Sequence, residues 1–434
     1  MRMSRLALAA LALPLLAGCS SLVDNQTMGP APAAVVPSGG AMFSNYIALG
    51  TSIGAGVQSG GINDSTQKLA YPYLLAVAMG STIGVNWTYP SFSMPGCPPP
   101  YVNPLTGLRV TLPGYPVSTG TSCYLLNPAM IRPYTHNLGV PSIRAAQVLN
   151  IDNLAFPPTD TLLAANFITG SRNPIDIVLA AKPTFVTLEI GANDVLGAAT
   201  HGSAALLTPL ATFETQWTAI ADTVALTGAK VAVANVPNVT VIPHFSPGVI
   251  FYCLKNGGPA CPSPLPPATP PYNSAAFTVD NSCLPTAAGG VGDQMLVTFT
   301  ATGAITGTLA AGGAATLNCA SGVATVNQGA GFVPAGPVLT PAATTAIATE
   351  VVQIDSFIHL QAIARGWAYV DLNGLLAANA AFIPKFPSFS TPATLFGVLF
   401  SLDGVHPTAA GHKAIADAFA TAINGKYGTT LPLP

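Results

Sequence analysis

An aspartate and a histidine stand three positions apart in SLDGVHPTAAGH (401–412), close to the end of a chain with few charges. Histidine titrates near neutrality and can take a proton from a hydroxyl group. A carboxylate bonded to its second ring nitrogen would fix the tautomer and stabilise the imidazolium. Asp403 and His406 can make this contact within a local turn, so the pair predicts acid–base chemistry. The simpler alternative is a histidine that caps a helix or lies on the surface.

Ser52 is the candidate nucleophile for this pair, 354 positions upstream of His406. It lies in ALGTSIGAG (48–56), a glycine-flanked turn after an apolar strand, from which a hydroxyl can point into a cleft. A phosphate loop is excluded because no Gly-Lys-Ser/Thr follows, and the position at the start of the domain argues against a nucleophile elbow. Taken alone, a turn serine that bonds its own backbone is the simpler interpretation.

Asn193 could complete the site as a donor. It belongs to GAND (191–194), directly after a second apolar strand, where its amide could donate to a developing oxyanion. Loss of one such donor costs about 10²–10³ in rate. An Asn-Asp turn without function is an equal alternative. A glycosidase-like pair of Glu189 and Asp194 is disfavoured, because Glu189 lies inside the strand and Asp194 is interpreted as a turn residue supporting Asn193.

The elements that must position these residues alternate between strands and helices. Strands are predicted at 45–49, 182–190, 229–235 and 367–371, and helices at 72–79, 344–365 and 406–424. This alternation predicts an α/β domain with a parallel sheet, in which ligands bind at the carboxyl ends of the strands. Two segments, about 87–133 and 245–341, break the alternation and are interpreted as insertions. VTFTATGAITGTL (297–309) is expected to have β character.

In this order and at these strand ends, ALGTSI, GAND and DGVHP resemble blocks I, III and V of the SGNH (GDSL-type) hydrolase superfamily. HNLGVPSIRA (136–145) resembles block II, and the resemblance spans roughly 45–418 outside the insertions. It implies a three-layer flavodoxin-like α/β/α fold and hydrolysis of esters without a metal or another cofactor. By position it implies Ser52 as nucleophile, Asp403 as orienting acid and His406 as general base. The oxyanion hole would comprise Ser52, Ser142 and Asn193.

The chain departs from the family pattern at two positions. Thr51 replaces the family's aspartate, which is not expected to abolish activity. Ser142 stands where block II has a glycine that donates an oxyanion N–H. Serine keeps the N–H but does not share the conformational range of glycine. Gly139 is the alternative donor if the alignment slips by three positions.

The remaining histidines are expected to have structural roles. His412 is predicted to lie exposed on the final helix. His244, which follows a strand end, is weighed as a residue that lines the cleft. The other three are interpreted as ordinary polar positions: His136, His201 and His359.

Composition narrows the class of protein. The 434 residues carry a net charge of −2, and only 7% of them are charged, so no basic patch favours nucleic acid as a partner. Half of the residues are hydrophobic, but no apolar run of membrane-spanning length follows the N-terminus. The 42 glycines and 41 prolines favour a loop-rich secreted protein.

The N-terminus predicts export and anchoring. Arg2 and Arg5 precede the apolar run LALAALALPLLA, and LAGC then resembles a bacterial lipobox that would lipidate Cys19. We therefore expect a lipoprotein signal at 1–18, a flexible tether at 19–42 and the hydrolase domain at 43–434. Ser20, in place of aspartate after the cysteine, resembles an outer-membrane address in the bacterial cell envelope. An ordinary cleaved signal peptide is the alternative.

The six other cysteines predict disulfides, because an even number in an exported chain favours pairing. Six cysteines allow 15 connectivities, and proximity favours Cys97–Cys123, Cys253–Cys261 and Cys283–Cys319. Cys-x-x-Cys spacing is lacking, so no structural metal is expected.

These observations predict an exported, lipid-anchored serine esterase or lipase that acts on a small-molecule or lipid ester. Four aromatic residues suggest an acyl-chain substrate: Trp87, Tyr89, Phe92 and Tyr101. A carbohydrate or cell-wall O-deacetylase is the alternative enzyme. A non-catalytic surface binding lipoprotein is the alternative of another class. The oligomeric state is not predicted.

Overall fold

The computed structural model describes residues 40–111, 134–152, 167–259, 261, 265 and 272–434, all within the unit Val36–Pro434. The predicted signal at 1–18, Cys19 and nearly all of the tether lie outside the described residues and stay predictions. No helix in the described ranges is long and apolar enough to cross a membrane.

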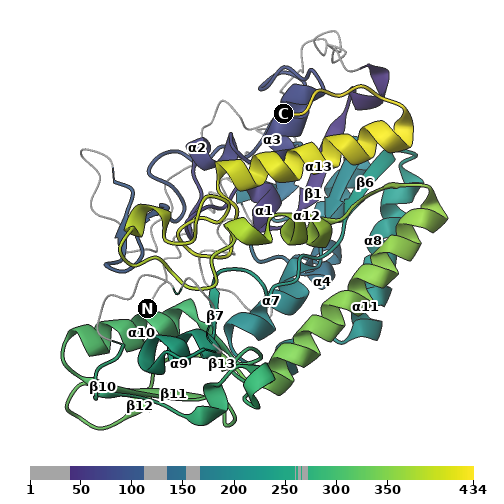
Figure 1. Ribbon diagram of the computed structural model, residues 1–434. Coiled ribbons are helices and arrows are strands. Elements are labelled where there is room, and N and C mark those ends of the chain that lie inside the picture. The colour runs from purple at the N-terminus through teal and green to yellow at the C-terminus, as the bar shows by residue number, and fades with distance from the viewer. Residues whose placement is uncertain (1–39, 112–133, 153–166, 260, 262–264, 266–271) are drawn as a thin grey trace, which may run out of the picture. The chain divides into compact units, whose positions relative to one another are not determined.

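A parallel sheet of five strands forms the centre of the fold (Figure 1). Its order is β4-β1-β5-β6-β14, which becomes 2-1-3-4-5 when the strands are counted along the chain. This is the flavodoxin-like, doubly wound order, so the predicted α/β class and topology are confirmed. The strands are β1 (Tyr46–Gly50), β4 (Asn137–Gly139), β5 (Phe185–Glu189), β6 (Lys230–Ala234) and β14 (Ala368–Val370).

Helices cover both faces of the sheet, because alternate residues of each buried strand pack in opposite directions. Ile47 and Leu49 face a layer formed by α4 (Ala145–Leu149), α6 (Pro174–Ala181), α7 (Ala192–Thr200), α8 (Leu210–Leu226) and α11 (Pro341–Arg365). Tyr46 and Ala48 face the other layer, formed by α3 (Tyr71–Ala78), α12 (Leu372–Ala378) and α13 (Ala409–Tyr427). The sheet therefore lies between two helical layers (Figure 1).

The predicted strands correspond to β1, β5, β6 and β14, and the predicted helices to α3, α11 and α13. Helix α11 begins three residues before its predicted start, because the Thr340 hydroxyl accepts the Ala343 N–H at 3.1 Å and Pro341 occupies the first turn. Gly366, with φ +66°, ends this helix as expected.

The segment 245–341 has a hydrophobic core of its own. It forms two sheets, β12-β11-β10-β8 and β13-β9-β7, packed with two helices. These elements are β7 (Phe245–Pro247), α9 (Gly248–Asn256), β8 (Phe277–Val279), β9 (Leu296–Thr298), α10 (Phe299–Ala310), β10 (Ala314–Asn318), β11 (Val323–Asn327), β12 (Val333–Pro334) and β13 (Val338–Leu339).

The predicted β character of 297–309 is wrong for most of that stretch, which forms helix α10. The Thr298 hydroxyl caps the helix by accepting the Ala301 N–H at 3.3 Å. Ala301, Ile305 and Leu309 are buried at a spacing of four residues, the period of a helix face. Packing on this face outweighs the strand preference of its threonines and isoleucine.

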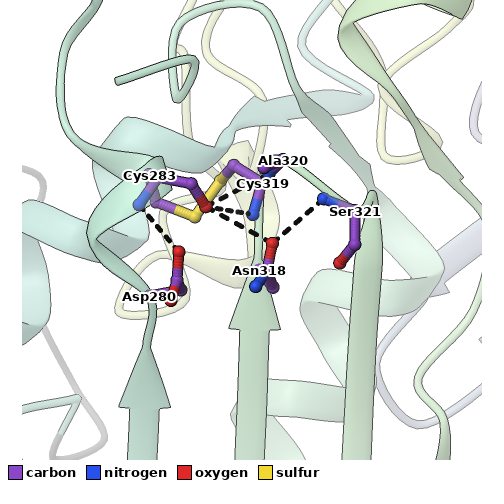
Figure 2. The surroundings of a disulfide bond; sticks show 7 residues. Asp280, Cys283, Asn318, Cys319, Ala320 and Ser321 are labelled. Carbon is purple, nitrogen blue, oxygen red and sulfur yellow. Dashed lines mark hydrogen bonds between the residues drawn. A yellow bond between two sulfur atoms is a disulfide. The ribbon is translucent and has the colours of Figure 1, made fainter. Parts of the chain in front are cut away.

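Two predicted disulfides are present, Cys253–Cys261 and Cys283–Cys319. Figure 2 shows the second, which ties the short helix Asn281–Cys283 to the end of β10. The Ser282 hydroxyl accepts the Cys319 N–H there at 3.1 Å. Cys97 is also disulfide-bonded, but its predicted partner Cys123 lies outside the described residues.

The described part of the segment 87–133 contains a short hairpin, β2 (Tyr101–Asn103) and β3 (Leu108–Arg109). Trp87, Tyr89 and Phe92 are at most 3% exposed and belong to the core. These three therefore fill the interior and do not support the predicted acyl-chain surface. The guanidinium of Arg109 lies over the ring of Tyr101, with the guanidinium carbon 3.7 Å from the ring centroid.

Candidate active site

The candidate residues gather where the strand order of the sheet reverses. β1 and β5 are adjacent, with Gly50 paired to Glu189 at their carboxyl ends. Ser52 follows β1 after one residue, and α7, which carries Asn193, follows β5. In doubly wound sheets this switch point is where ligands bind.

Ser52 is the first residue of the short helix α1 (Ser52–Ala55), which Thr51 caps. Its side chain is largely buried, with 8% of the residue exposed. Ser52 Oγ lies 2.9 Å from His406 Nε2, within hydrogen-bond distance. The fold therefore brings together a serine and a histidine that are 354 positions apart in sequence.

Asp403 and His406 lie in the loop before α13. The predicted contact is present, with His406 Nδ1 2.8 Å from Asp403 Oδ2. Asp403 Oδ1 also accepts the backbone N–H groups of Val405 and His406, each at 2.8 Å. Although burial opposes its ionisation, His406 and these N–H donors hold the pKa of Asp403 below its ordinary range. Asp403 is therefore a carboxylate that fixes both the loop and the imidazole.

Gly404 allows this loop to close against the segment that contains His244. Its φ is +69°, and a Cβ at this position would lie 2.9 Å from the backbone nitrogen of His244. His244 Nδ1 donates to the carbonyl of Asp403 at 3.0 Å. Burial lowers the pKa of His244, which favours the neutral ring. His244 and Asp403 line a common cavity of about 520 Å³.

Three supporting residues had no role in the sequence analysis. The Gly60 N–H donates to Asp403 Oδ2 at 2.6 Å, and the Ser59 N–H donates to Ser401 Oγ at 2.7 Å. Ser401 Oγ in turn donates to Asp403 Oδ1 at 3.2 Å. The loop after α1 thus holds the aspartate through contacts about 340 positions apart in sequence. No local sequence signal marks such contacts.

Asn193 and Ser142 line a common cavity of about 200 Å³. One N–H of the Asn193 amide donates to the carbonyl of Ile143 at 2.9 Å, which orients the side chain and leaves a second N–H on the same nitrogen. Asn193 lies in the first turn of α7, so GAND begins a helix and is not an isolated turn. Ser142 adopts φ +60°, so serine occupies the left-handed region here.

Gly139, the alternative oxyanion donor, has its backbone N–H engaged by a neighbouring side chain. It is the last residue of β4, and its N–H already donates to Asn137 Oδ1 at 2.9 Å. A Cβ on Gly139 would lie 2.2 Å from the backbone nitrogen of Ala55, so the missing side chain lets β4 approach α1. Of the two alternatives, only Ser142 lines the cavity beside Asn193.

Glu189 and Asp194 bond to separate parts of the fold. Asp194 accepts from the Ala145 N–H at 3.1 Å and from Thr208 Oγ1 at 2.8 Å, and burial raises its pKa to about 6. It lies in helix α7, so the prediction of a turn residue is wrong. Glu189 binds Thr51, and burial raises its pKa to about 7. These contacts give no support to a glycosidase-like pair.

The predicted exposure of His412 is wrong, because its side chain is 0% exposed. It continues the buried face of α13, four residues before Ala416 and seven before Phe419. Burial, with the electrostatic interaction with His406 as a second cause, lowers the pKa of His412 to about 3. The other three histidines have structural contacts: His136 with Thr88, His201 with Gly197 and His359 with Tyr369.

We expect a His412→Leu variant to lose less stability in acid than the wild type. Below pH 6.5 the unfolded chain protonates this histidine, whereas the folded state keeps it neutral down to about pH 3. Stability is therefore lost as pH falls through this window, by about 2 kcal/mol at pH 5. Urea unfolding at pH 7 and pH 5 measures the difference. Equal acid losses in both proteins would contradict the buried, neutral assignment.

Two further cavities lie near these elements. A small apolar one, of about 80 Å³, is lined by Ile53, Val405 and Pro407, the sequence neighbours of Ser52 and His406. A larger one, of about 550 Å³, lies at Asn235 and Asp355 and contains no residue of the Ser52–His406–Asp403 chain. The carboxylate of Asp355 accepts the Val236 N–H at 2.9 Å and also accepts a hydrogen bond from the amide of Asn373. Within the described ranges, no three metal-ligating side chains cluster.

Comparison with known proteins gives little beyond this geometry. No family model matches the sequence, and no curated protein matches it. Among solved structures, the chain is similar to an extracellular lipase from Streptomyces rimosus, at 14% identity and a TM-score of 0.34. The match covers 88% of this chain and 99% of that one. A likeness this weak does not indicate what the present chain does.

Proposed function

We propose that the chain is a serine-dependent carboxylic ester hydrolase with Ser52 as nucleophile, His406 as general base and Asp403 as orienting acid. One observation carries this proposal, the unbroken series of contacts from Ser52 Oγ to His406 Nε2 at 2.9 Å and from His406 Nδ1 to Asp403 Oδ2 at 2.8 Å. A base within this distance can take the serine proton, and an oriented base is the arrangement that activates a serine.

In the proposed reaction, Ser52 Oγ bonds to the ester carbonyl carbon as its proton moves to His406 Nε2. The C–O bond to the alcohol then breaks, and the leaving oxygen takes that proton from His406. Water next adds to the acyl-enzyme with His406 as base, which releases the acid and returns the proton to Ser52. Asp403 stays ionised throughout and stabilises the imidazolium, in agreement with its lowered pKa.

We propose that the oxyanion is held by the backbone N–H groups of Ser52 and Ser142 and by the amide of Asn193. The cavity shared by Ser142 and Asn193 supports this role, as does the second N–H of the oriented amide. Donors fixed in place before the reaction stabilise charge in the transition state without reorganisation. Gly139 is the weaker candidate, because its N–H is already engaged.

The cavity at Ile53 and the cavity at Asn193 favour different substrates. The cavity at Ile53, Val405 and Pro407 is almost entirely apolar and would suit the acyl chain of an esterase or lipase substrate. The cavity at Asn193 is lined by Leu196 and Leu206 together with Arg144, Thr200 and His201, and these three polar side chains would suit a polar alcohol group. The second feature favours carbohydrate O-deacetylation as the alternative activity.

A series of p-nitrophenyl esters from acetyl to palmitoyl tests the proposal and separates these activities. We expect hydrolysis, together with covalent labelling by a fluorophosphonate, and peptide mapping should place the label on Ser52. Activity confined to acetyl esters would favour a deacetylase, whereas longer chains would favour an esterase or lipase. A folded protein that hydrolyses no ester and takes no label would instead favour the non-catalytic binding protein.

A further inference from the structure

Glu189 is a buried carboxylate that the proposed reaction does not use. It is the last residue of β5, it pairs in register with Gly50, and it is 2% exposed. Strands covered on both faces ordinarily carry apolar side chains, since burial of a charge without partners is costly. The partners of this carboxylate therefore indicate why it is here.

Two groups of Thr51 donate to this carboxylate, and the backbone N–H of Gly54 is a further donor. The Thr51 backbone N–H lies 3.0 Å from Glu189 Oε2, and Thr51 Oγ1 lies 2.8 Å from Oε1 and 3.0 Å from Oε2. Thr51 Oγ1 also accepts the N–H of Ile53 at 3.4 Å and so caps α1. Contacts thus run from Glu189 through Thr51 to both sides of Ser52.

The surroundings of the carboxylate place it directly under the turn that carries Ser52. A Cβ added to Gly50 would lie 3.1 Å from Glu189 Oε2 and 3.4 Å from the hydroxyl of Tyr71. Tyr71 on α3 and His406 on the loop before α13 are the titratable groups that act on this region. Glu189 contacts Thr51 before Ser52 and Gly54 after it, so its effect on the nucleophile is indirect.

We propose that Glu189 is a positioning residue for the nucleophile, which holds Thr51 so that Ser52 Oγ is presented to His406 Nε2. The inference rests on the proposed ester hydrolysis. Glu189 thereby has a part in the reaction, whereas the sequence pattern places it only inside an apolar strand. An error of about 1 Å in the position of a reacting group can cost about 10²-fold in rate, so a support of this kind affects turnover more than binding.

The test compares Glu189→Gln and Thr51→Val, with Thr187→Val as the matched control. Gln keeps the size of the side chain but turns one acceptor oxygen into an N–H donor, which would face a donor of Thr51. Thr187 lies two residues earlier on the same face of β5, and its hydroxyl bonds Tyr46 at 2.9 Å without touching Thr51. The Thr187→Val variant measures how far the loss of a buried hydrogen bond in β5 lowers kcat and stability by itself.

We expect Glu189→Gln to lower kcat for p-nitrophenyl ester hydrolysis by about 10- to 100-fold with little change in KM. Thr51→Val should lower kcat in the same direction, and the double variant should lose less than the two single losses combined, because the bond between the Thr51 hydroxyl and Glu189 is disturbed in both. Thr51→Ser keeps the hydroxyl and should restore most of kcat. Thr187→Val should keep kcat even where its melting temperature falls.

Two results would overturn the inference: a folded Glu189→Gln protein with kcat within twofold of wild type, or an equal loss of kcat in Thr187→Val. If Glu189→Gln does not fold, Thr51→Val and Thr51→Ser decide by the same criteria. Ser52→Ala separates this inference from the proposed function. Full activity in Ser52→Ala would refute both the proposed hydrolysis mechanism and the role of Glu189. An inactive Ser52→Ala together with a fully active Glu189→Gln would refute only the role of Glu189.

Discussion

Ser52→Ala should abolish ester hydrolysis while the protein stays folded. The variant lacks the oxygen that would form the acyl-enzyme, and His406 Nε2 loses the partner that lies 2.9 Å away in the native site. Removal of the serine from a Ser-His-Asp site costs on the order of 10⁶ in kcat. Slow attack by water on a bound ester can persist, because the proposed oxyanion donors are untouched.

Steady-state hydrolysis of p-nitrophenyl esters measures this loss, and thermal unfolding checks the fold. Ser91→Ala is the matched control, because Ser91 is a buried serine whose hydroxyl bonds Asp64 at 2.6 Å and none of the three proposed catalytic residues. It should keep its activity. An active Ser52→Ala protein would refute the nucleophile and, with it, the proposed mechanism.

The central sheet could be predicted from sequence because its signals are local. β1, β5, β6 and β14 are each a short apolar run that ends at glycine, proline or a polar cap. β4 was not predicted as a strand, since its three residues carry too little pattern, although they lie within the motif HNLGVPSIRA that resembles block II. The elements within the segment 245–341 were not predicted, and several of its strand pairs join distant residues, such as Phe245 with Thr298 and Phe277 with Ala315.

His412 shows a signal that was present in the sequence but outweighed by residue type. It stands three, four, seven and eight residues before Ile415, Ala416, Phe419 and Ala420, on the apolar stripe of α13. Helical periodicity therefore placed it in the core, while the polar character of histidine favoured the surface. In this helix the periodicity was the better guide.

Glu189 and the loop at Ser59–Gly60 show what sequence alone does not contain. The order Ser52, Asn193, Asp403, His406 can be recognised because the first two follow predicted strands and the last two stand at the start of the predicted final helix. The contacts that hold them join β5 to the turn before α1, and the loop after α1 to Asp403. Such pairings depend on strand order and loop packing, so a single sequence indicates the candidate site residues better than the contacts that support them.

Asp403→Asn should lower kcat by about 10⁴-fold, the cost of the wrong histidine tautomer in a Ser-His-Asp site. Asp403 Oδ1 accepts two backbone N–H groups and Ser401 Oγ, whereas Oδ2 accepts the Gly60 N–H and faces His406 Nδ1. The asparagine amide nitrogen should take the Oδ2 position, because fewer donors oppose it there. It would then donate to His406 Nδ1 and leave the proton on Nε2, where the ring can no longer accept the proton of Ser52.

Asp417→Asn is the matched control for this substitution. Asp417 lies on α13 and bonds Lys413 at 3.0 Å in an exposed pair, so the variant should keep full activity and nearly full stability. Kinetics on one p-nitrophenyl ester, with fluorophosphonate labelling of Ser52, compares the two proteins. Slow labelling together with slow turnover in Asp403→Asn would locate the defect in activation of the serine. Because Asp403 stays ionised in the folded protein, a variant that kept turnover within tenfold of wild type would show that His406 needs no carboxylate to act as base.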